Sequence, residues 1–235
     1  MSDANAHLDP LVHLPQPDHP DARADARARL GRAIRDLGHA VVGHEASTDD
    51  LLRAAAAVEQ LSARFDLGRA RHRDELPPYL RPRVNEDPPG EGEVMRSHDE
   101  RPISGRASPW GLDVEIVREG MEAVGRVTLR SAHEGAPGRS HGGLVAALFD
   151  DVYGFVLAIH LQLAFTGELS IRYEAPTPIG RPLECRTRLV GRERRKMFMT
   201  GELLDDGAVI ARSTATFISI PRELFLGLEP DEGLD

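Results

Sequence analysis

Two aspartates lie in the middle of the most apolar stretch of the sequence. This stretch runs from 140 to 159 and reads SHGGLVAALFDDVYGFVLAI. It is long enough for a core helix, and the two carboxylates are Asp150 and Asp151. A carboxylate inside an apolar helix is costly to remove from water unless it has a partner or a function. These two positions are therefore the first candidates for chemistry.

A helical projection divides the stretch into two faces. Bulky side chains form one stripe, which we expect to pack on a sheet: Leu144, Leu148, Val152, Phe155 and Ile159. Small side chains form the opposite stripe: Gly143, Ala146, Ala147, Gly154 and Ala158. Asp150 lies within the small stripe, where a ligand or another backbone can come close, so it is the candidate functional carboxylate. Asp151 lies at the boundary of the faces, and we expect a solvated or capping role for it.

The start of this predicted helix offers a second chemical group. Gly142 and Gly143 leave the first-turn N–H groups unobstructed, at the positive end of the helix dipole. Such N–H groups can stabilise a carbonyl oxygen as it becomes an oxyanion. Gly142 and Asp150 are separated by about 12 Å along the helix axis, too far for both to act on one carbon. If both act, we expect Asp150 to come from a symmetry-related subunit, which predicts a dimer.

The sequence around the helix resembles a known family. The run EGAPGRSHGGLVAALFDD, from Glu134 to Asp151, is similar to the PaaI-like group of hotdog-fold acyl-CoA thioesterases. In that group an HGG triplet opens the central helix, a carboxylate follows nine residues after the histidine, and a Ser or Thr begins the next strand. His141, Asp150 and Thr166 occupy those places here. The resemblance covers roughly residues 104–220, about half of the chain.

The resemblance implies a role for each of these residues. The Gly142 N–H would bind the thioester carbonyl, and Asp150 of the facing subunit would activate water or attack the carbon directly; we favour the general base. Thr166 would hold the water or the carboxylate. His141 and Gly143 would position the substrate, although His141 also has a structural role available, because it can fix the loop by hydrogen bonding. No cofactor is expected, since a thioester is already activated.

One departure from the family keeps an alternative open. Many relatives carry Asn or Gln six residues before the HGG histidine, where this sequence has Gly135. Without that side-chain donor, the chain could also be a hotdog module that binds acyl-CoA without hydrolysing it. A hydratase on the same fold would need a paired Asp and His, and this pattern is not found around Asp150.

A basic run later in the chain is a candidate for contact with coenzyme A. It comprises Arg192, Arg194, Arg195 and Lys196. Arginine side chains suit phosphate groups well, but such a run is also an ordinary charged end of a hairpin. The isolated histidines His72 and His98 lack metal-ligand spacing, so no metal site is expected.

Composition limits the function classes. Among 235 residues the formal net charge is −9, which argues against nucleic acid as a partner. The first residues lack the basic start and apolar centre of a signal peptide, and His160 interrupts the longest apolar run, so we expect no membrane insertion. The lone Cys185 forms no internal disulfide, which fits the cytoplasm. It alternates with charged neighbours like a core-facing strand residue, so it is not expected to be a nucleophile.

Patterning divides the chain into segments. We expect a flexible tail at 1–20, an N-terminal helical hairpin at 21–68, a proline-rich linker at 69–103, a hotdog thioesterase domain at 104–221 and an acidic C-terminal tail at 222–235. The hairpin helices are expected at 22–42 and 49–65, with a cap near Ser47. Their apolar stripes need to be covered. We favour packing on the domain or on a second copy, with a lid over the acyl pocket or a partner-docking arm as alternatives.

The domain itself reads as α+β. Strands are expected at 112–118, 121–131, 166–173, 183–190, 196–204 and 209–220. The order is two strands, the apolar helix, then four strands, which suggests an antiparallel sheet wrapped around a buried helix. That arrangement agrees with the hotdog fold implied by the resemblance. The partners expected are an acyl-CoA substrate and copies of the chain itself, as a homodimer or a dimer of dimers.

Overall fold

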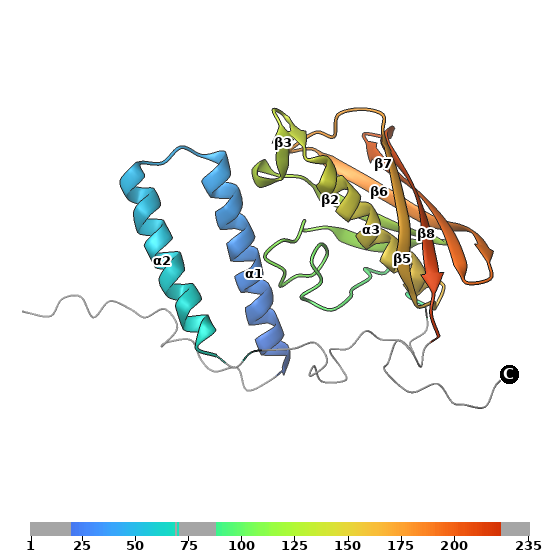
Figure 1. The fold of residues 1–235 in the computed structure, drawn as a ribbon, viewed down its shortest axis with the longest axis horizontal. Coiled ribbons are helices and arrows are strands. Elements are labelled where there is room, and N and C mark those ends of the chain that lie inside the picture. The colour runs from blue at the N-terminus through green and yellow to red at the C-terminus, as the bar shows by residue number, and fades with distance from the viewer. Residues whose placement is uncertain (1–19, 69, 71–87, 222–235) are drawn as a thin grey trace, which may run out of the picture.

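The computed structural model describes residues 20–68, 70 and 88–221 (Figure 1). The predicted tails and much of the predicted linker therefore lie outside the described residues. The helices are α1 (Pro20–Gly43), α2 (Thr48–Asp66) and α3 (Gly142–Ile159), with a short 3₁₀ turn, η3, at Ser131–His133. The strands are β1 (Glu115–Glu119), β2 (Glu122–Thr128), β3 (Glu134–Ala136), β4 (Arg139–Ser140), β5 (Ala164–Tyr173), β6 (Pro182–Glu193), β7 (Lys196–Asp205) and β8 (Ala208–Ser219).

Six antiparallel strands form one sheet, in the order β1-β2-β6-β7-β8-β5. The sheet curves around α3, which confirms the predicted α+β hotdog fold (Figure 1). Each predicted strand is present within a few residues of its expected bounds. Strand β5, which follows α3, lies at one edge of the sheet, so one side of β5 has no neighbouring strand within the described chain.

Helix α3 packs closely on the concave face of the sheet. Its most deeply buried side chains are Val145, Leu148, Phe149, Val152, Tyr153 and Val156. Two strand glycines allow this approach: a Cβ added at Gly125 would lie 3.0 Å from Val152, and one at Gly201 would lie 3.0 Å from Phe149. The sequence therefore places small residues in the sheet where the bulky face of the helix meets it.

The segment before β1 is irregular but not detached. Val94 forms a β-bridge with Val117, and Met95 and Leu112 are buried in the core of the domain. Part of the chain that reads as a linker therefore packs against the sheet and the central helix.

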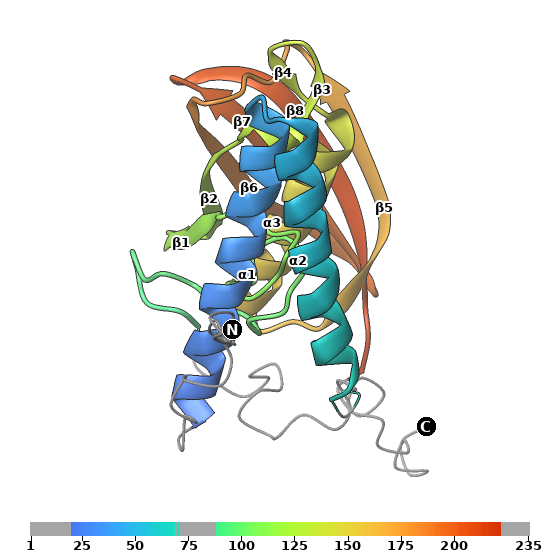
Figure 2. The same cartoon turned by 90° about the vertical axis from the view of Figure 1, so that its left-hand side faces the viewer.

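The N-terminal helices form the predicted hairpin, with Ser47 as the N-cap of α2. Helix α1 lies against the domain: the buried Arg35 guanidinium donates to Asp113 at 2.6 Å, and His39 Nδ1 accepts from the Ala132 N–H at 3.1 Å. Helix α2 lies beyond α1 and none of its residues is buried. Figure 2 shows the two helices side by side in front of α3.

Candidate functional site

The first turn of α3 is organised by His141. This residue is the N-cap, and its Nδ1 accepts a hydrogen bond of 3.0 Å from the Gly143 N–H. The Nδ1 atom must therefore carry a lone pair, which places the proton of the neutral ring on Nε2. The His141 N–H donates to the His133 carbonyl at 2.9 Å, which ties the cap to η3. The histidine thus fixes the loop in front of the helix.

This cap leaves Gly142 as the free donor of the first turn. The Gly143 N–H is engaged by His141, whereas the Gly142 N–H has no acceptor within the described part of the chain. The Gly142 carbonyl accepts a hydrogen bond of 2.7 Å from the Tyr173 hydroxyl at the end of β5. Partial burial raises the pKa of Tyr173, so this hydroxyl stays a donor across the physiological range. Nothing in the sequence pattern indicated this role for Tyr173.

Asp150 lies on the exposed side of α3, eight positions after Gly142. Its Oδ1 accepts a hydrogen bond of 2.7 Å from the Thr166 hydroxyl on β5. The pairing of β5 with β8 shifts register between Thr166 and Glu168, and such an irregularity re-aims the side chains beside it. The structure therefore brings Asp150 and Thr166 together from two elements. Within one chain it leaves Gly142 and Asp150 about 12 Å apart along the helix axis, as expected.

The expectation for Asp151 is wrong, because its side chain is buried rather than solvated. Arg101 donates from Nε to Asp151 Oδ1 at 2.5 Å and from Nη2 to the Asp151 carbonyl at 2.9 Å. The Arg101 guanidinium also lies 4.9 Å from the centre of the Phe155 ring. The second carboxylate oxygen, Oδ2, is buried without a partner among the described residues. Asp151 therefore anchors the segment before β1 to α3.

The small-residue stripe of α3 is correspondingly shorter than expected. A Cβ added at Gly154 would collide with the Arg101 guanidinium, so Gly154 provides space for this arginine and not for a ligand. Ala146 and Ala147 are half-buried, while Gly143 and Ala158 are exposed. The open part of the stripe thus centres on Asp150.

Gly135 has a steric explanation. It lies in β3, which packs on the loop before α3, and a Cβ added there would lie 2.8 Å from the His141 Cα. An asparagine or glutamine at this position would displace the N-cap of α3. The missing side-chain donor is therefore coupled to the close packing of the β3–β4 hairpin against His141.

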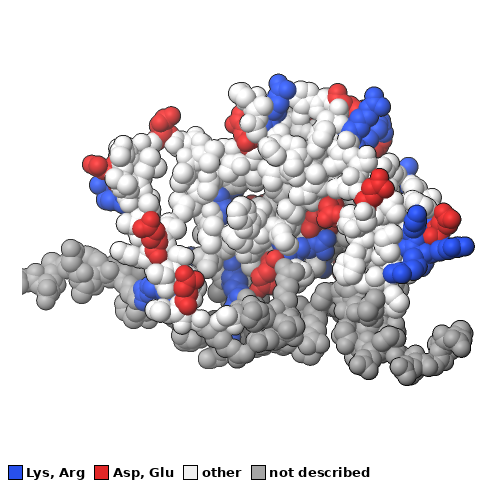
Figure 3. Space-filling model, viewed as in Figure 1, with Lys and Arg blue, Asp and Glu red and all other residues white. Residues whose placement is uncertain are grey.

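The basic run occupies the tight turn between β6 and β7. Arg194 has a φ of 51°, and Arg192, Arg194, Arg195 and Lys196 are all exposed. The register places Lys196 opposite Ile218, and Ile218 opposite Phe165, the neighbour of Thr166. Figure 3 shows basic side chains gathered at this end of the sheet. The turn thus lies at the same end of the sheet as Thr166, although among the described residues it makes no hydrogen bond or ion pair with Asp150.

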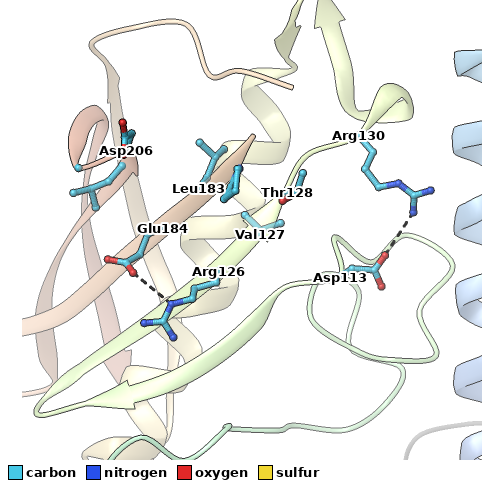
Figure 4. Close-up of a pocket in the computed structure, with 11 residues that line it drawn as sticks. Asp113, Arg126, Val127, Thr128, Arg130, Leu183, Glu184 and Asp206 are labelled. Atoms are coloured by element: carbon cyan, nitrogen blue, oxygen red, sulfur yellow. Dashed lines mark ion pairs between the residues drawn. The ribbon is translucent and has the colours of Figure 1, made fainter. Parts of the chain in front are cut away.

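A surface hollow of about 540 Å³ lies elsewhere (Figure 4). Its arginines already have acidic partners: Arg126 pairs with Glu184 at 3.5 Å, and Arg130 lies 3.9 Å from Asp113. None of the candidate site residues lines it. Pairing weakens the attraction of these arginines for a ligand anion, so this hollow is not a candidate site.

Other sequence predictions concern single elements. Cys185 is fully buried in β6, and burial raises the pKa of its thiol, so it is a core residue as expected. Helix α3 is long and apolar enough to cross a membrane, but more than half of it is buried inside the domain. Among the described residues, no group of three or more His, Cys, Asp or Glu side chains is arranged to hold a metal ion.

Comparison with known proteins gives the family context of this site. Residues 138–211 match the family model described as "Thioesterase superfamily". The mouse acyl-coenzyme A thioesterases THEM4 and THEM5 are 33% and 30% identical to this chain over 92 residues, which is 38% of this chain. The chain spans 40% and 37% of the length of these two relatives.

A solved crystal structure extends the likeness of the fold. It is described as a thioesterase superfamily protein, and it matches with a TM-score of 0.65 at 24% identity, covering 82% of this chain and 94% of its own. A match of this extent reaches beyond the hotdog domain into the N-terminal extension. The sheet around α3, the family match and these relatives agree: the part of the chain from 138 to 211 is similar to the thioesterase superfamily, and it lies in a hotdog fold.

Proposed function

We propose that this protein hydrolyses an acyl-CoA thioester to a free acid and CoA, with Asp150 as the general base. The observation that carries the proposal is the 2.7 Å hydrogen bond between Thr166 and Asp150 on the exposed side of α3. A base must reach the proton that it removes, and an exposed carboxylate held by one oxygen leaves the other free for water. The mouse relatives that share this region are named acyl-coenzyme A thioesterases.

The reaction needs few groups. Asp150 takes a proton from water as the water oxygen forms a bond to the thioester carbon. The carbonyl oxygen then carries the negative charge, and the Gly142 N–H at the positive end of α3 stabilises it. When the carbon–sulfur bond breaks, the CoA sulfur leaves and takes the proton back from Asp150. The products are the carboxylic acid and the free thiol, and Asp150 returns to its starting state.

We place Gly142 and Asp150 of one site on different subunits. Their separation of about 12 Å along one helix is too large for both to contact one tetrahedral centre. A two-fold axis beside α3 would bring the Asp150 of one subunit toward the Gly142 of the other. His141 and Tyr173 then act as positioning residues, since both hold the Gly142–Gly143 peptide group, which directly follows the Gly142 N–H in the chain.

The test is hydrolysis of a panel of short, long and aromatic acyl-CoAs, with release of free thiol followed over time. We expect wild type to hydrolyse at least one class, and Asp150→Asn to reduce kcat by about 100-fold or more. Glu168→Gln is the matched control, because Glu168 is an exposed carboxylate on the same strand as Thr166 and has no role in the proposed site.

Two results would contradict this function. Full activity of Asp150→Asn would remove Asp150 from the mechanism. Binding of an acyl-CoA by wild type without turnover of any member of the panel would favour the alternative, a hotdog module that binds acyl-CoA without hydrolysing it.

A further inference from the structure

The N-terminal hairpin carries a large apolar surface that the rest of the described chain does not cover. On α1 it comprises Leu30, Ile34, Leu37, Val41 and Val42, and on α2 and the turn after it Leu51, Leu52, Val58, Leu61, Phe65 and Leu67. Each of these side chains is between 38% and 88% exposed. We call this set the hairpin surface. It exceeds the single scattered apolar residues that are normal on a protein surface.

The docking of α1 leaves this surface free. The residues of α1 that the domain buries are Gly31, Arg35 and His39, which recur every fourth position along one side of the helix. This side is mainly polar, and its arginine and histidine are held by hydrogen bonds to the domain. The apolar stripe that begins at Leu30 lies on another side of the helix. Packing against its own domain therefore does not explain the apolar residues of α1.

Helix α2 likewise exposes its apolar side chains. It has 19 residues, and none of them is buried within the protomer. In proteins, most of the stability of a helix comes from packing an apolar face and not from helix propensity. Val58, Leu61 and Phe65 recur at helical spacing, whereas Gln60 lies on the opposite side. The sequence thus encodes an apolar face on α2 for which the described part of the protomer provides no partner surface.

We propose that the hairpin is a dimerisation arm, and that a second copy of this chain covers the hairpin surface. The eleven side chains together expose on the order of 1,000 Å², close to what one partner contributes to a stable interface of standard size. A face that is mainly aliphatic is typical of permanent association between copies, whereas transient partners bind through more polar surfaces. An arm that extends from one protomer over a second copy buries this face in both.

The position of α2 indicates which neighbouring subunit it would contact. In Figure 2, α2 stands in front of α3 and on the same side of α1 as the edge strand β5. Strand β5 carries Thr166, which contacts Asp150. A subunit that approaches the Asp150 side of α3 to complete the site would therefore also meet α2. This part of the inference rests on the proposed function.

The experiment compares the association of full-length variants by sedimentation equilibrium. Val58→Glu/Phe65→Glu places two charges on the hairpin surface, and Gln60→Glu places one on the opposite face of the same helix. All three positions are exposed in the protomer, and glutamate favours helices. We therefore expect the variants to keep the protomer fold, and far-ultraviolet circular dichroism checks this. We expect a wild-type dimer, a dissociation constant raised about 100-fold or more in the double variant, and little change in Gln60→Glu.

Hydrogen exchange of the peptide 48–66 provides a second measurement. In the wild-type dimer its amides should be protected, and in the dissociated double variant they should exchange rapidly. A monomeric wild type would overturn the arm, and so would a double variant that associates as tightly as wild type.

Activity separates the arm from the proposed function. A wild type that dimerises through α2 but hydrolyses no acyl-CoA keeps the arm and contradicts the function. A wild type that hydrolyses acyl-CoA, with a double variant that still associates, keeps the function and contradicts the arm. A dissociated double variant with full activity would contradict the view that the copy under the arm is the one that completes the site.

Discussion

Asp150 and Asp151 are consecutive in sequence, but their carboxylates lie in opposite environments. Asp150 is exposed and accepts a hydrogen bond from Thr166, whereas Asp151 is buried and paired with Arg101. The angle of about 100° between neighbouring helical residues separates them. Because the buried pair is fixed to the segment before β1, it also holds α3 in the rotation that presents Asp150 outward.

The Thr166 hydroxyl should orient the base. Thr166→Val removes the hydrogen bond to Asp150 and nearly preserves side-chain volume, so we expect kcat to fall by roughly 10- to 100-fold. Thr166→Ser keeps a hydroxyl and should remain within a few-fold of wild type. Steady-state kinetics on the best acyl-CoA substrate measure both variants. Equal losses in Val and Ser variants would indicate that packing, and not the hydrogen bond, is what matters.

The Arg101–Asp151 pair should contribute to stability rather than to chemistry. Arg101→Met leaves a buried carboxylate without its partner, so we expect the free energy of unfolding to fall by roughly 3 kcal/mol. Arg106→Met is the control, because Arg106 pairs with Asp99 in a more exposed position and should cost less than about 1 kcal/mol. Urea denaturation measures the difference.

The double variant Arg101→Met/Asp151→Leu completes this comparison. It removes both charges, and we expect it to recover most of the lost stability. If Arg101→Met and Arg106→Met have the same effect, the buried pair has no special role.

The junction between α1 and the domain should weaken in acid. Burial, with the neighbouring His39 and Arg130, lowers the pKa of His133 to about 4, and Asp113 opposes this shift. The pKa of His39 is also lowered, chiefly by burial. The unfolded chain, with an ordinary histidine pKa near 6.5, therefore binds protons that the folded chain does not.

Stability should consequently be full above about pH 6.5 and decline as the pH falls toward 4. For His133 the loss is on the order of 3 kcal/mol. Urea midpoints measured between pH 7.5 and 4 test this, and His133→Gln should flatten the dependence. If the urea midpoint of the wild type rises as the pH falls, this prediction is wrong.

The basic turn between β6 and β7 should act on the CoA moiety. Arg194→Glu/Arg195→Glu reverses two exposed charges, and we expect the KM for acyl-CoA to rise about tenfold while kcat changes little. The control substrate is the same acyl group on N-acetylcysteamine, which has no phosphates and should show no change. An unchanged KM for acyl-CoA would make the run an ordinary charged turn.

The structural features that depend on local sequence pattern could be predicted from the sequence alone. Alternating strands, the apolar helix with its opening glycines, and the hairpin helices each leave a periodic signal, and all are present in the structure. The placement of Asp150 on an open face followed from helical geometry. Its contact with Thr166 was implied by the family resemblance and matches the fold.

Features that depend on contacts between residues far apart in the sequence could not be predicted from local pattern. Asp151 lies at the edge of the bulky face, and its environment is set by Arg101, which is 50 positions earlier in a segment without periodicity. Tyr173 contacts Gly142 because β5 runs back along α3, a relation that no spacing encodes. Gly154 illustrates the same limit, because its small size is required by the Arg101 guanidinium and not by a ligand.

The most direct test of a site shared between subunits is to mix two inactive variants. Gly142→Pro removes the free N–H, and proline suits this first helical position because His141 has an extended conformation, with φ −66° and ψ 130°. Gly142→Ala is the matched control, since it adds a similar Cβ and keeps the N–H. We expect Gly142→Pro to lose about 100-fold or more in kcat relative to Gly142→Ala.

Mixed with Asp150→Asn under conditions of subunit exchange, Gly142→Pro should regain activity. One site of each mixed dimer would combine an intact Gly142 with an intact Asp150, so the mixture should reach about one quarter of wild-type activity. If the mixture stays as inactive as its two components while mixed dimers are shown to form, Gly142 and Asp150 do not act across the subunit interface, and the proposed mechanism is wrong.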